Sequence, residues 1–180
     1  PSCLRLLVGA LRQRPDAAAA MPKIIYPDGR LYCTGIEERG DLYWVDRDLG
    51  APDDGRRDRP EDLFGVTGCC ALHRRGDWLA LGGLDPAFHM YYEDVDYSLR
   101  VSAAGKRMLY VPSARVRHYG HGSISKVPAG KDVLGERNRL LVLAAHRRAA
   151  FAAQCVRSPW FQSAPPDELV ALLPEIAKRF

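Results

Sequence analysis

The sequence lacks the patterns that mark several protein classes. Its five cysteines are odd in number and form no Cys-x-x-Cys pair, so neither a disulfide framework nor a zinc site is indicated. The best apolar run, LLVLAA at 140–145, is far shorter than the ~20 residues of a membrane helix. The opening PSCLRLLVGALRQRP has no small-residue cleavage site and predicts an amphipathic helix rather than a signal peptide. These absences predict a cytoplasmic location.

The sequence also lacks a strong charge bias. A net charge of +4, carried mostly by arginine, is too small to indicate nucleic-acid binding, and no aromatic-basic RNA signature is present. A hydrophobic content of 47% and a charged content of 27% are typical of a soluble globular domain. At 180 residues the chain is long enough to bury a core, and it is most simply one domain.

Alternating patterns along the chain predict a mixed α/β fold. The expected helices cover 2–14, a short segment near Trp78, 93–104, 132–154 and a final stretch after Pro165. The expected strands cover 18–26, 31–34, 63–72, 107–111 and 115–119, with a PDGR turn at 27–30. The polar, Gly/Pro-rich stretch 37–60 predicts a long solvated loop, and its Asp53 and Asp54 are not expected to bind metal.

The densest group of acids and aromatic residues lies at 84–100, read as LDPAFHMYYEDVDYSLR. Aromatic rings favour burial and bring neighbouring carboxylates into partly dehydrated surroundings, where their pKa values rise. Carboxylates in such surroundings serve as general bases or as ligands of hard cations. Glu93, Asp94 and Asp96 are therefore candidates for a functional site. The alternative is that these three acids only stabilise the first turn of a helix through its dipole.

An ordered series of motifs extends this stretch in both directions. GGLDPAFHMYYEDVDYSLR resembles the C-terminal signature of family 2 glycosyltransferases, especially their rhamnosyltransferase-like branch. VTGCCALHRR upstream, and AGKRMLYVPSARVRHYGHGS and GERNRLLVL downstream, resemble the segments that surround that signature in the family. The resemblance covers about residues 1–148, and an ordered series is far more specific than any single motif.

The resemblance implies a GT-A fold, an α/β/α sandwich whose first half binds the nucleotide and supplies an Asp-x-Asp pair for Mg²⁺ or Mn²⁺. The opening of this chain resembles the segment just downstream of that pair. We therefore expect the C-terminal part of a GT-A domain, lacking the N-terminal nucleotide-binding half. Residues 1–155 would form this acceptor and catalytic-base part, and residues 156–180 a tail with an amphipathic helix.

By the same resemblance the chain would take part in inverting transfer of a sugar from a nucleotide-diphosphate sugar to a glycan or lipid-linked acceptor, in cell-surface polysaccharide synthesis. Asp94 would be the catalytic base, Tyr91 and Tyr92 would stack on sugar faces, and Glu93 and Asp96 would orient the loop or contact acceptor hydroxyls. The acceptor-binding residues would be Gly68, Asp85, Tyr91, Tyr92, Glu93 and Asp96.

His118 lies at the end of the strand expected at 115–119. A lone histidine is more often structural than a ligand, but a histidine at this point joins the metal in some members of the resembled family, with His121 as a nearby competitor. The basic side chains of the helix expected at 132–154 could rest on anionic phosphate or lipid head groups at the inner face of a membrane, although such a face is more often only solvated. An unpaired strand at 63–72 would favour self-association.

Two other functions stay open. An inactive remnant would keep the fold and bind a carbohydrate or a protein. A metal-dependent hydrolase could use the same acids, although it would need no family-ordered series of motifs around them.

Overall fold

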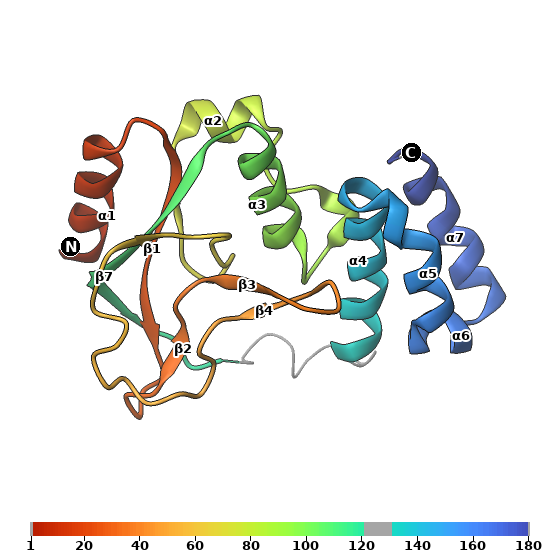
Figure 1. Ribbon diagram of the computed structural model, residues 1–180, viewed down its shortest axis with the longest axis horizontal. Coiled ribbons are helices and arrows are strands. Elements are labelled where there is room, and N and C mark those ends of the chain that lie inside the picture. Colours follow the sequence, from red (N-terminus) through yellow and green to blue (C-terminus); the bar gives the residue numbers. More distant parts are fainter. Residues whose placement is uncertain (1, 121–130, 180) are drawn as a thin grey trace. The chain divides into compact units, whose positions relative to one another are not determined.

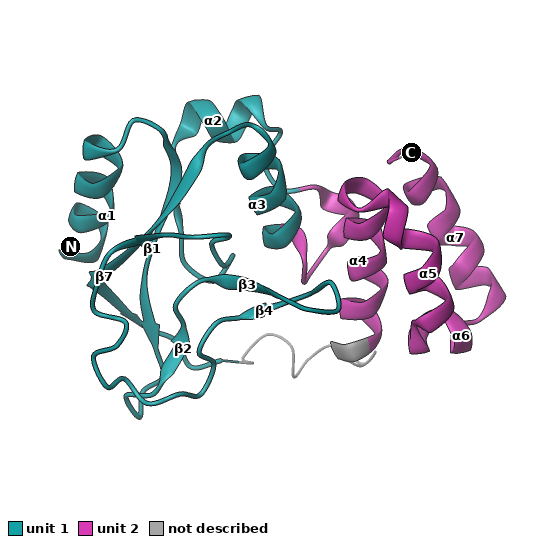
Figure 2. Ribbon diagram, in the orientation of Figure 1, with its two compact units in different colours: residues 1–84, 94–122 teal, residues 85–93, 123–180 magenta. Residues whose placement is uncertain are grey.

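The computed structural model describes residues 2–120 and 131–179, which belong to two compact units. Unit 1 comprises residues 1–84 and 94–122, and unit 2 comprises residues 85–93 and 123–180 (Figure 2). This division differs from the expected boundary at residue 155, because helices on both sides of that residue belong to unit 2.

The centre of unit 1 is a parallel pair of strands, β1 (Ala17–Ile25) and β7 (Arg107–Arg117). All of β1 except Ile25 is buried, as expected for a parallel strand that is covered on both faces. Pro22 pairs with Val111 and Lys23 with Arg115, so β7 bulges at 112–114. The Pro-Ser turn expected there is this bulge within one continuous strand.

Three short strands complete the sheet, and a separate hairpin lies beside it (Figure 1). β1 pairs antiparallel with two of them, and β7 pairs antiparallel with the third. The two strands that pair with β1 are β2 (Leu31–Cys33) and β6 (Leu72–His73), and the strand that pairs with β7 is β5 (Glu61–Asp62). The separate hairpin is formed by β3 (Ile36–Arg39) and β4 (Tyr43–Asp46). The predicted turn between β1 and β2 is confirmed, with Gly29 at a φ of 88°.

Helices cover the two faces of β1 and β7. On one face α1 (Ser2–Gln13) packs Leu7 and Leu11 against Leu109 and Val111. On the other face α3 (Glu93–Ala103) packs Tyr97 and Val101 against Met108 and Tyr110. Figure 1 shows these two helices on opposite sides of the strand pair, with α2 (Arg75–Ala80) near one end of it. The start of α3 at Glu93 confirms the helix predicted from the sequence.

The long strand predicted over 63–72 is wrong. The Leu63 N–H donates to Met108 O of β7, but Gly65 O accepts from Ile36 N of the hairpin, and the Gly68 N–H donates to the Asp94 carboxylate. Successive backbone groups thus bond to three different partners rather than to one neighbouring strand. A Cβ on Gly65 would lie 2.8 Å from Ser98 Oγ, so glycine is needed where the chain crosses α3. The strand on which we based self-association is therefore only Leu72–His73.

The stretch 37–60, predicted to be a solvated loop, contains the β3–β4 hairpin and a segment that ion pairs fix to the sheet. Lys23 of β1 is fully buried, and its Nζ lies 2.6 Å from Asp53 Oδ1 and 2.5 Å from Asp58 Oδ1. Arg115 of β7 also pairs with Asp53, at 3.0 Å. A buried ammonium group requires such partners, and the polar residues of this segment supply them.

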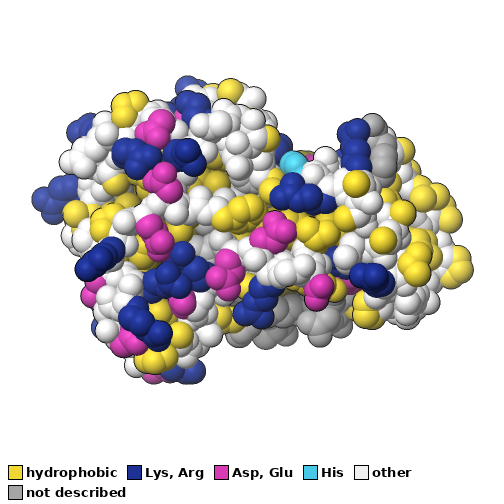
Figure 3. Space-filling model, viewed as in Figure 1, with side chains coloured by type: hydrophobic (Ala, Val, Ile, Leu, Met, Phe, Trp, Pro, Cys, Tyr) yellow, Lys and Arg dark blue, Asp and Glu magenta, His cyan; other side chains and the backbone are white. Residues whose placement is uncertain are grey.

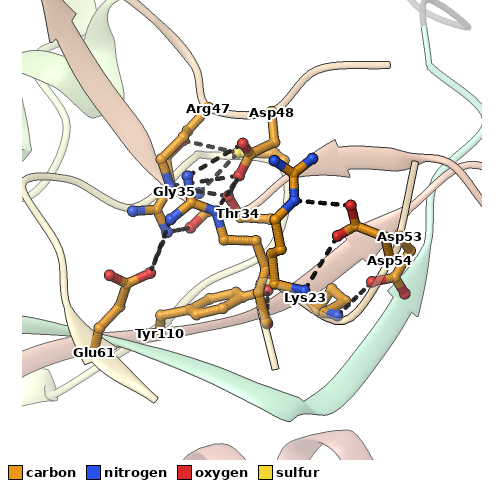
Figure 4. Close-up of polar contacts among 12 residues, drawn as sticks. Lys23, Thr34, Gly35, Arg47, Asp48, Asp53, Asp54, Glu61 and Tyr110 are labelled. Carbon is orange, nitrogen blue, oxygen red and sulfur yellow. Dashed lines mark hydrogen bonds and ion pairs between the residues drawn. The ribbon is translucent and has the colours of Figure 1, made fainter. Parts of the chain in front are cut away.

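A second group of charges holds the other end of the same stretch. Arg47 Nη2 lies 2.7 Å from Glu61 Oε1 (Figure 4). Arg57 Nε lies 2.7 Å from Asp48 Oδ2. On the face drawn in Figure 3, basic and acidic side chains are interspersed over unit 1 rather than separated by sign. The charges that suggested a loop in solvent are thus largely paired with one another.

Unit 2 is built around α4 (Lys131–His146). The apolar run that the sequence shows at its centre is fully buried from Leu140 to Ala144. The single helix expected over 132–154 is two, because α4 ends at His146 and a new helix begins at Arg148. The remaining helices of the unit are η1 (Pro86–Phe88, a 3₁₀-helix), α5 (Arg148–Arg157), α6 (Pro159–Ser163) and α7 (Pro166–Ala177).

Two arginines of the basic face predicted for α4 bind partners inside unit 2. Arg139 is 1% exposed and binds Glu136 and Gln154 inside unit 2, and Arg137 is partly buried beside Ala87 O. These guanidinium groups satisfy internal acceptors, so the argument for lipid contact through them does not hold. None of the helices that the structure describes is long and apolar enough to cross a bilayer.

Candidate functional site

Asp94 and Gly68, predicted separately from the sequence, lie together in unit 1. The Gly68 N–H donates to Asp94 Oδ2 at 2.8 Å, although 26 residues separate the two along the chain. Asp94 also lies in the first turn of α3, where the helix dipole favours a negative charge. Both the helix and the irregular Gly65–Gly68 segment thus fix one partly exposed carboxylate in place.

Two thiols lie near this carboxylate but do not form a nucleophilic site. Burial raises the pKa of Cys69 to about 11, with added contributions from neighbouring Cys70, Asp46 and Asp94. Burial raises the pKa of Cys33 still further. Both thiols are therefore neutral at pH 7, and the thiolate required for nucleophilic attack is scarce. The reactive group that this arrangement offers is the carboxylate.

Asp96 points into the protein, where it is 4% exposed. Its Oδ2 accepts from Arg100 Nε at 2.9 Å and from Arg100 Nη2 at 2.7 Å, and Arg100 also donates to the carbonyls of Leu81 and Gly83. Arg100 therefore ties α3 to the turn before the acidic stretch. Of the two predicted roles of Asp96, orienting the local backbone fits this geometry better than touching an acceptor hydroxyl.

Asp85 begins the acidic loop in unit 2. Its Oδ1 accepts from the Ala87 N–H at 2.9 Å and caps η1, and its Oδ2 forms an ion pair with Arg179 after α7. The Arg179 guanidinium also lies 5.6 Å from the centre of the Phe88 ring. Asp85 thus has partners within the protein, and its predicted acceptor contact stays a prediction.

Tyr91 and Tyr92 occupy backbone conformations that L-amino acids rarely adopt. Their φ values are 69° and 66°, and His89 before them has a φ of 58° and a ψ of −60°. The Met90 N–H donates to Phe88 O at 2.6 Å, so His89 is the centre of a γ-turn of the rare strained form. Each such residue costs about 1–3 kcal/mol, and strain of this kind concentrates at ligand-binding and active sites. The backbone therefore supports the prediction that this loop is functional.

Glu93 also shows a feature of a functional carboxylate. Its Oε2 is buried without a hydrogen-bond partner among the described residues, and burial raises the pKa of the side chain. A carboxyl group in these surroundings holds its proton to a higher pH than an exposed glutamate does. Its predicted role, to orient the loop or contact an acceptor hydroxyl, stays a prediction.

His118 lies directly after β7 and does not belong to a complete metal site. Its backbone N–H donates to Ile25 O at 2.9 Å, and its ring packs edge-on against Tyr32, with 4.5 Å between ring centres. Among residues 2–120 and 131–179, no three His, Cys, Asp or Glu side chains are grouped to hold a metal ion. His121 lies outside the described residues. One imidazole supplies one ligand, so the residues described here do not fit a metal centre by themselves.

The sequence analysis missed the side chains that hold the acidic loop. Asn138 donates to three carbonyls of 88–91, and Arg100 and Arg179 bind Asp96 and Asp85. The Arg-Asn pair at 137–138 belongs to a motif quoted above, but a single buried asparagine gives no signal of its partners. Such contacts join residues far apart in the sequence, so spacing alone does not reveal them.

Comparison with solved structures identifies proteins that share this fold. A crystal structure of GalNAc-T7 with UDP, GalNAc and Mn²⁺ matches 96% of this chain and 35% of its own, with a TM-score of 0.58 and 16% identity. This likeness shows the fold, which is a mixed α/β architecture of the GT-A kind over most of the chain.

Curated sequences give more particular relatives. The chain is 29% identical over 176 residues to N-acetylglucosaminyl-diphospho-decaprenol L-rhamnosyltransferase of Mycobacterium tuberculosis (strain ATCC 25618 / H37Rv), covering 91% of this chain and 54% of that protein. It is 29% identical to O-antigen biosynthesis protein RfbC of Myxococcus xanthus, over 82% of this chain and 12% of RfbC. It is 43% identical to rhamnosyltransferase WbbL of Escherichia coli (strain K12), over 31% of this chain and 21% of WbbL.

The chain is thus distantly related to rhamnosyltransferases and resembles a glycosyltransferase. It spans about half the length of the M. tuberculosis relative and less of the other two. No model of a known protein family matches it.

Proposed function

We propose that this chain provides the catalytic base and acceptor site of an inverting glycosyltransferase that acts in cell-surface polysaccharide synthesis. The observation that carries the proposal is the Asp94 carboxylate, fixed by the Gly68 N–H at 2.8 Å at the start of α3. The rhamnosyltransferase relatives support the reaction class. The donor would be a nucleotide-diphosphate sugar, and the acceptor a hydroxyl of a glycan or lipid-linked sugar.

Asp94 accepts the proton of the acceptor hydroxyl as that oxygen attacks the anomeric carbon. The new C–O bond forms on the face opposite the departing nucleotide diphosphate, whose bond to the sugar breaks and which keeps the electron pair. Configuration at the anomeric carbon inverts. The hydrogen bond from Gly68 holds one carboxylate oxygen, so the base is oriented before substrate arrives.

The other predicted residues take supporting roles. Tyr91 and Tyr92 lie on the strained loop and stack on acceptor sugar faces, and Glu93 contacts an acceptor hydroxyl. Asp96 orients the backbone through Arg100. Gly68 presents its backbone beside Asp94.

The Mg²⁺ or Mn²⁺ implied by the resemblance would neutralise the charge of the departing diphosphate when bound. An Asp-x-Asp pair in the nucleotide-binding half of such an enzyme would hold it. His118 would be the ligand that this chain contributes. None of the proton-transfer steps above depends on it.

The test replaces Asp94 with asparagine in the complete translation product of the gene. Donor would be a nucleotide-diphosphate rhamnose, and acceptor an N-acetylglucosaminyl-diphospho-polyprenol. Asparagine keeps an oxygen for the Gly68 N–H but cannot take a proton. We expect Asp94→Asn to lower turnover by ~10²-fold or more, with the donor dissociation constant from calorimetry nearly unchanged.

Asp54→Asn is the matched control, because Asp54 lies in the 47–60 segment and pairs with the exposed Arg56. Its turnover should equal that of wild type. Wild-type turnover in Asp94→Asn would reject the assignment of the base. Binding of the acceptor with no turnover in the unmodified protein would instead favour a carbohydrate-binding module.

A further inference from the structure

The loop at 88–92 is held by one buried side chain. Asn138 of α4 is 0% exposed, and its Nδ2 lies 2.7 Å from Phe88 O, 2.8 Å from Met90 O and 2.9 Å from Tyr91 O. A single amide nitrogen thus contacts three carbonyls within four consecutive residues. These carbonyls converge because His89 and Tyr91 both have positive φ values.

The Asn138 carboxamide fits this position in one orientation. Arg137 Nη1 lies 2.6 Å from Asn138 Oδ1, so a donor faces the amide oxygen while three acceptors face the amide nitrogen. Turning the carboxamide over would place oxygen against oxygen on one side and N–H against N–H on the other. Arg137 Nη1 also reaches Ala87 O at 3.2 Å, which adds a fourth held carbonyl.

We propose that Asn138 is a positioning residue for acceptor binding, which fixes the 88–92 loop in the strained conformation that presents Tyr91 and Tyr92 to a sugar. This inference rests on the proposed function for the identity of the ligand. Without the three hydrogen bonds, His89, Tyr91 and Tyr92 would relax toward the φ values that L-residues favour. That relaxation would turn both tyrosine side chains in new directions.

The main variant is Asn138→Asp, which has the same shape but sets a carboxylate oxygen against the loop carbonyls. Asn138→Ser is the second variant. It is uncharged and too short to reach all three carbonyls, so it tests the same contacts if Asn138→Asp does not fold. Arg139→Met is the matched control, because Arg139 is the next residue in α4, is equally buried and binds Glu136 and Gln154 rather than the loop.

The first readout is amide hydrogen exchange of a peptide covering 85–93, followed by mass spectrometry of the full chain. We expect exchange at least ~10-fold faster than wild type in Asn138→Asp and Asn138→Ser, with no change in Arg139→Met. Peptides from β1 and β7 should exchange at the wild-type rate in every variant. Wild-type exchange in both Asn138 variants would overturn the inference, whatever their activity.

The second readout is the Michaelis constant of each substrate, measured with the donor and acceptor named above. Both Asn138 variants should raise the acceptor KM by ~10-fold or more and leave the donor KM unchanged, a split that general destabilisation would not produce. An equal rise in both constants would overturn the acceptor role. Faster loop exchange in the variants, with no sugar binding or turnover by the wild type, would reject the proposed function and still support Asn138 as the residue that holds the loop.

Discussion

Two irregular segments of this protein are held by polar side chains in opposite ways. In unit 1, the 47–60 segment is fixed by pairs of opposite charges, including the buried Lys23 with Asp53 and Asp58. In unit 2, the 88–92 loop is held by the neutral Asn138 and carries three residues with positive φ. The first segment has one non-glycine residue with positive φ, Asp48, and its buried charge is paired, whereas the second has three such residues between 89 and 92.

We interpret the ion pairs of the 47–60 segment as structural and the Asn138 contacts of the 88–92 loop as functional. A buried ion pair satisfies a charge that the sheet already contains, and its removal harms stability first. A strained loop gains nothing in stability from its strained backbone, so a ligand-binding role is the simplest reason to keep it. Three substitutions can break or sharpen this comparison.

The largest effect is expected at Lys23. Lys23→Met keeps the buried aliphatic volume but removes the ammonium group from Asp53 and Asp58. We expect a loss of about 3 kcal/mol in the free energy of unfolding, at the low end for a broken buried pair because Arg115 still pairs with Asp53. Urea denaturation followed by circular dichroism measures this loss.

Arg56→Ala controls for position in the same segment. Arg56 pairs with Asp54, but its side chain is 77% exposed, so the free energy of unfolding should change by less than about 0.5 kcal/mol. Equal losses in the two variants would show that burial of the lysine is not what matters.

A smaller effect of opposite sign is expected at His89. This residue is exposed and forms the centre of the strained γ-turn, so His89→Gly should stabilise the protein by about 1 kcal/mol. His89→Ala removes the same ring but keeps a Cβ, and it should give no such gain. Thermal denaturation of the pair compares them directly, and a stabilised alanine variant would argue against backbone strain.

The smallest effect concerns Glu93 and depends on pH. Because burial raises its pKa in the folded state, the folded protein binds this proton more tightly than the unfolded chain does. The stability that results is complete below the ordinary value of 4.5 and is lost as pH rises through the folded-state pKa. Glu93→Gln should therefore be more stable than wild type at pH 7, by no more than about 1 kcal/mol.

At pH 4 the difference between Glu93→Gln and wild type should disappear, since glutamine mimics the protonated acid. Urea midpoints measured at both pH values check this. A glutamine variant that is less stable at pH 7 would mean that Glu93 has a partner that stabilises its charge.

Local patterns were sufficient to predict several elements. The helix of 2–13, the turn at Gly29 and the start of α3 at Glu93 follow from apolar spacing and from glycine conformation, which depend on neighbours in sequence. The 63–72 segment failed because its backbone bonds to β7, to the hairpin and to Asp94 in turn. Propensity does not contain information about partners so distant in the sequence.

The candidate site was predicted in residue type but not in arrangement. Asp94 and Gly68 were both chosen from sequence, but their contact could not be, because it needs the chain to cross α3 at Gly65. Asp96 was chosen as an acid in partly dehydrated surroundings, and it is almost fully buried because Arg100 offers two donors at helical spacing. Asn138 was not chosen at all. It binds backbone carbonyls, which every residue has, so no sequence pattern marks its partners.

The pairing of β1 with β7 also affects how the chain must be made. Ala17 of β1 pairs with Arg107, and Ile25 pairs with Arg117, so the central pair cannot form on a ribosome until synthesis has passed Arg117. Until then the apolar Ala17–Met21 segment has no partner strand on that side, and nascent chains can aggregate through it. Slower translation at low temperature, or added chaperones, should therefore raise the yield of folded protein.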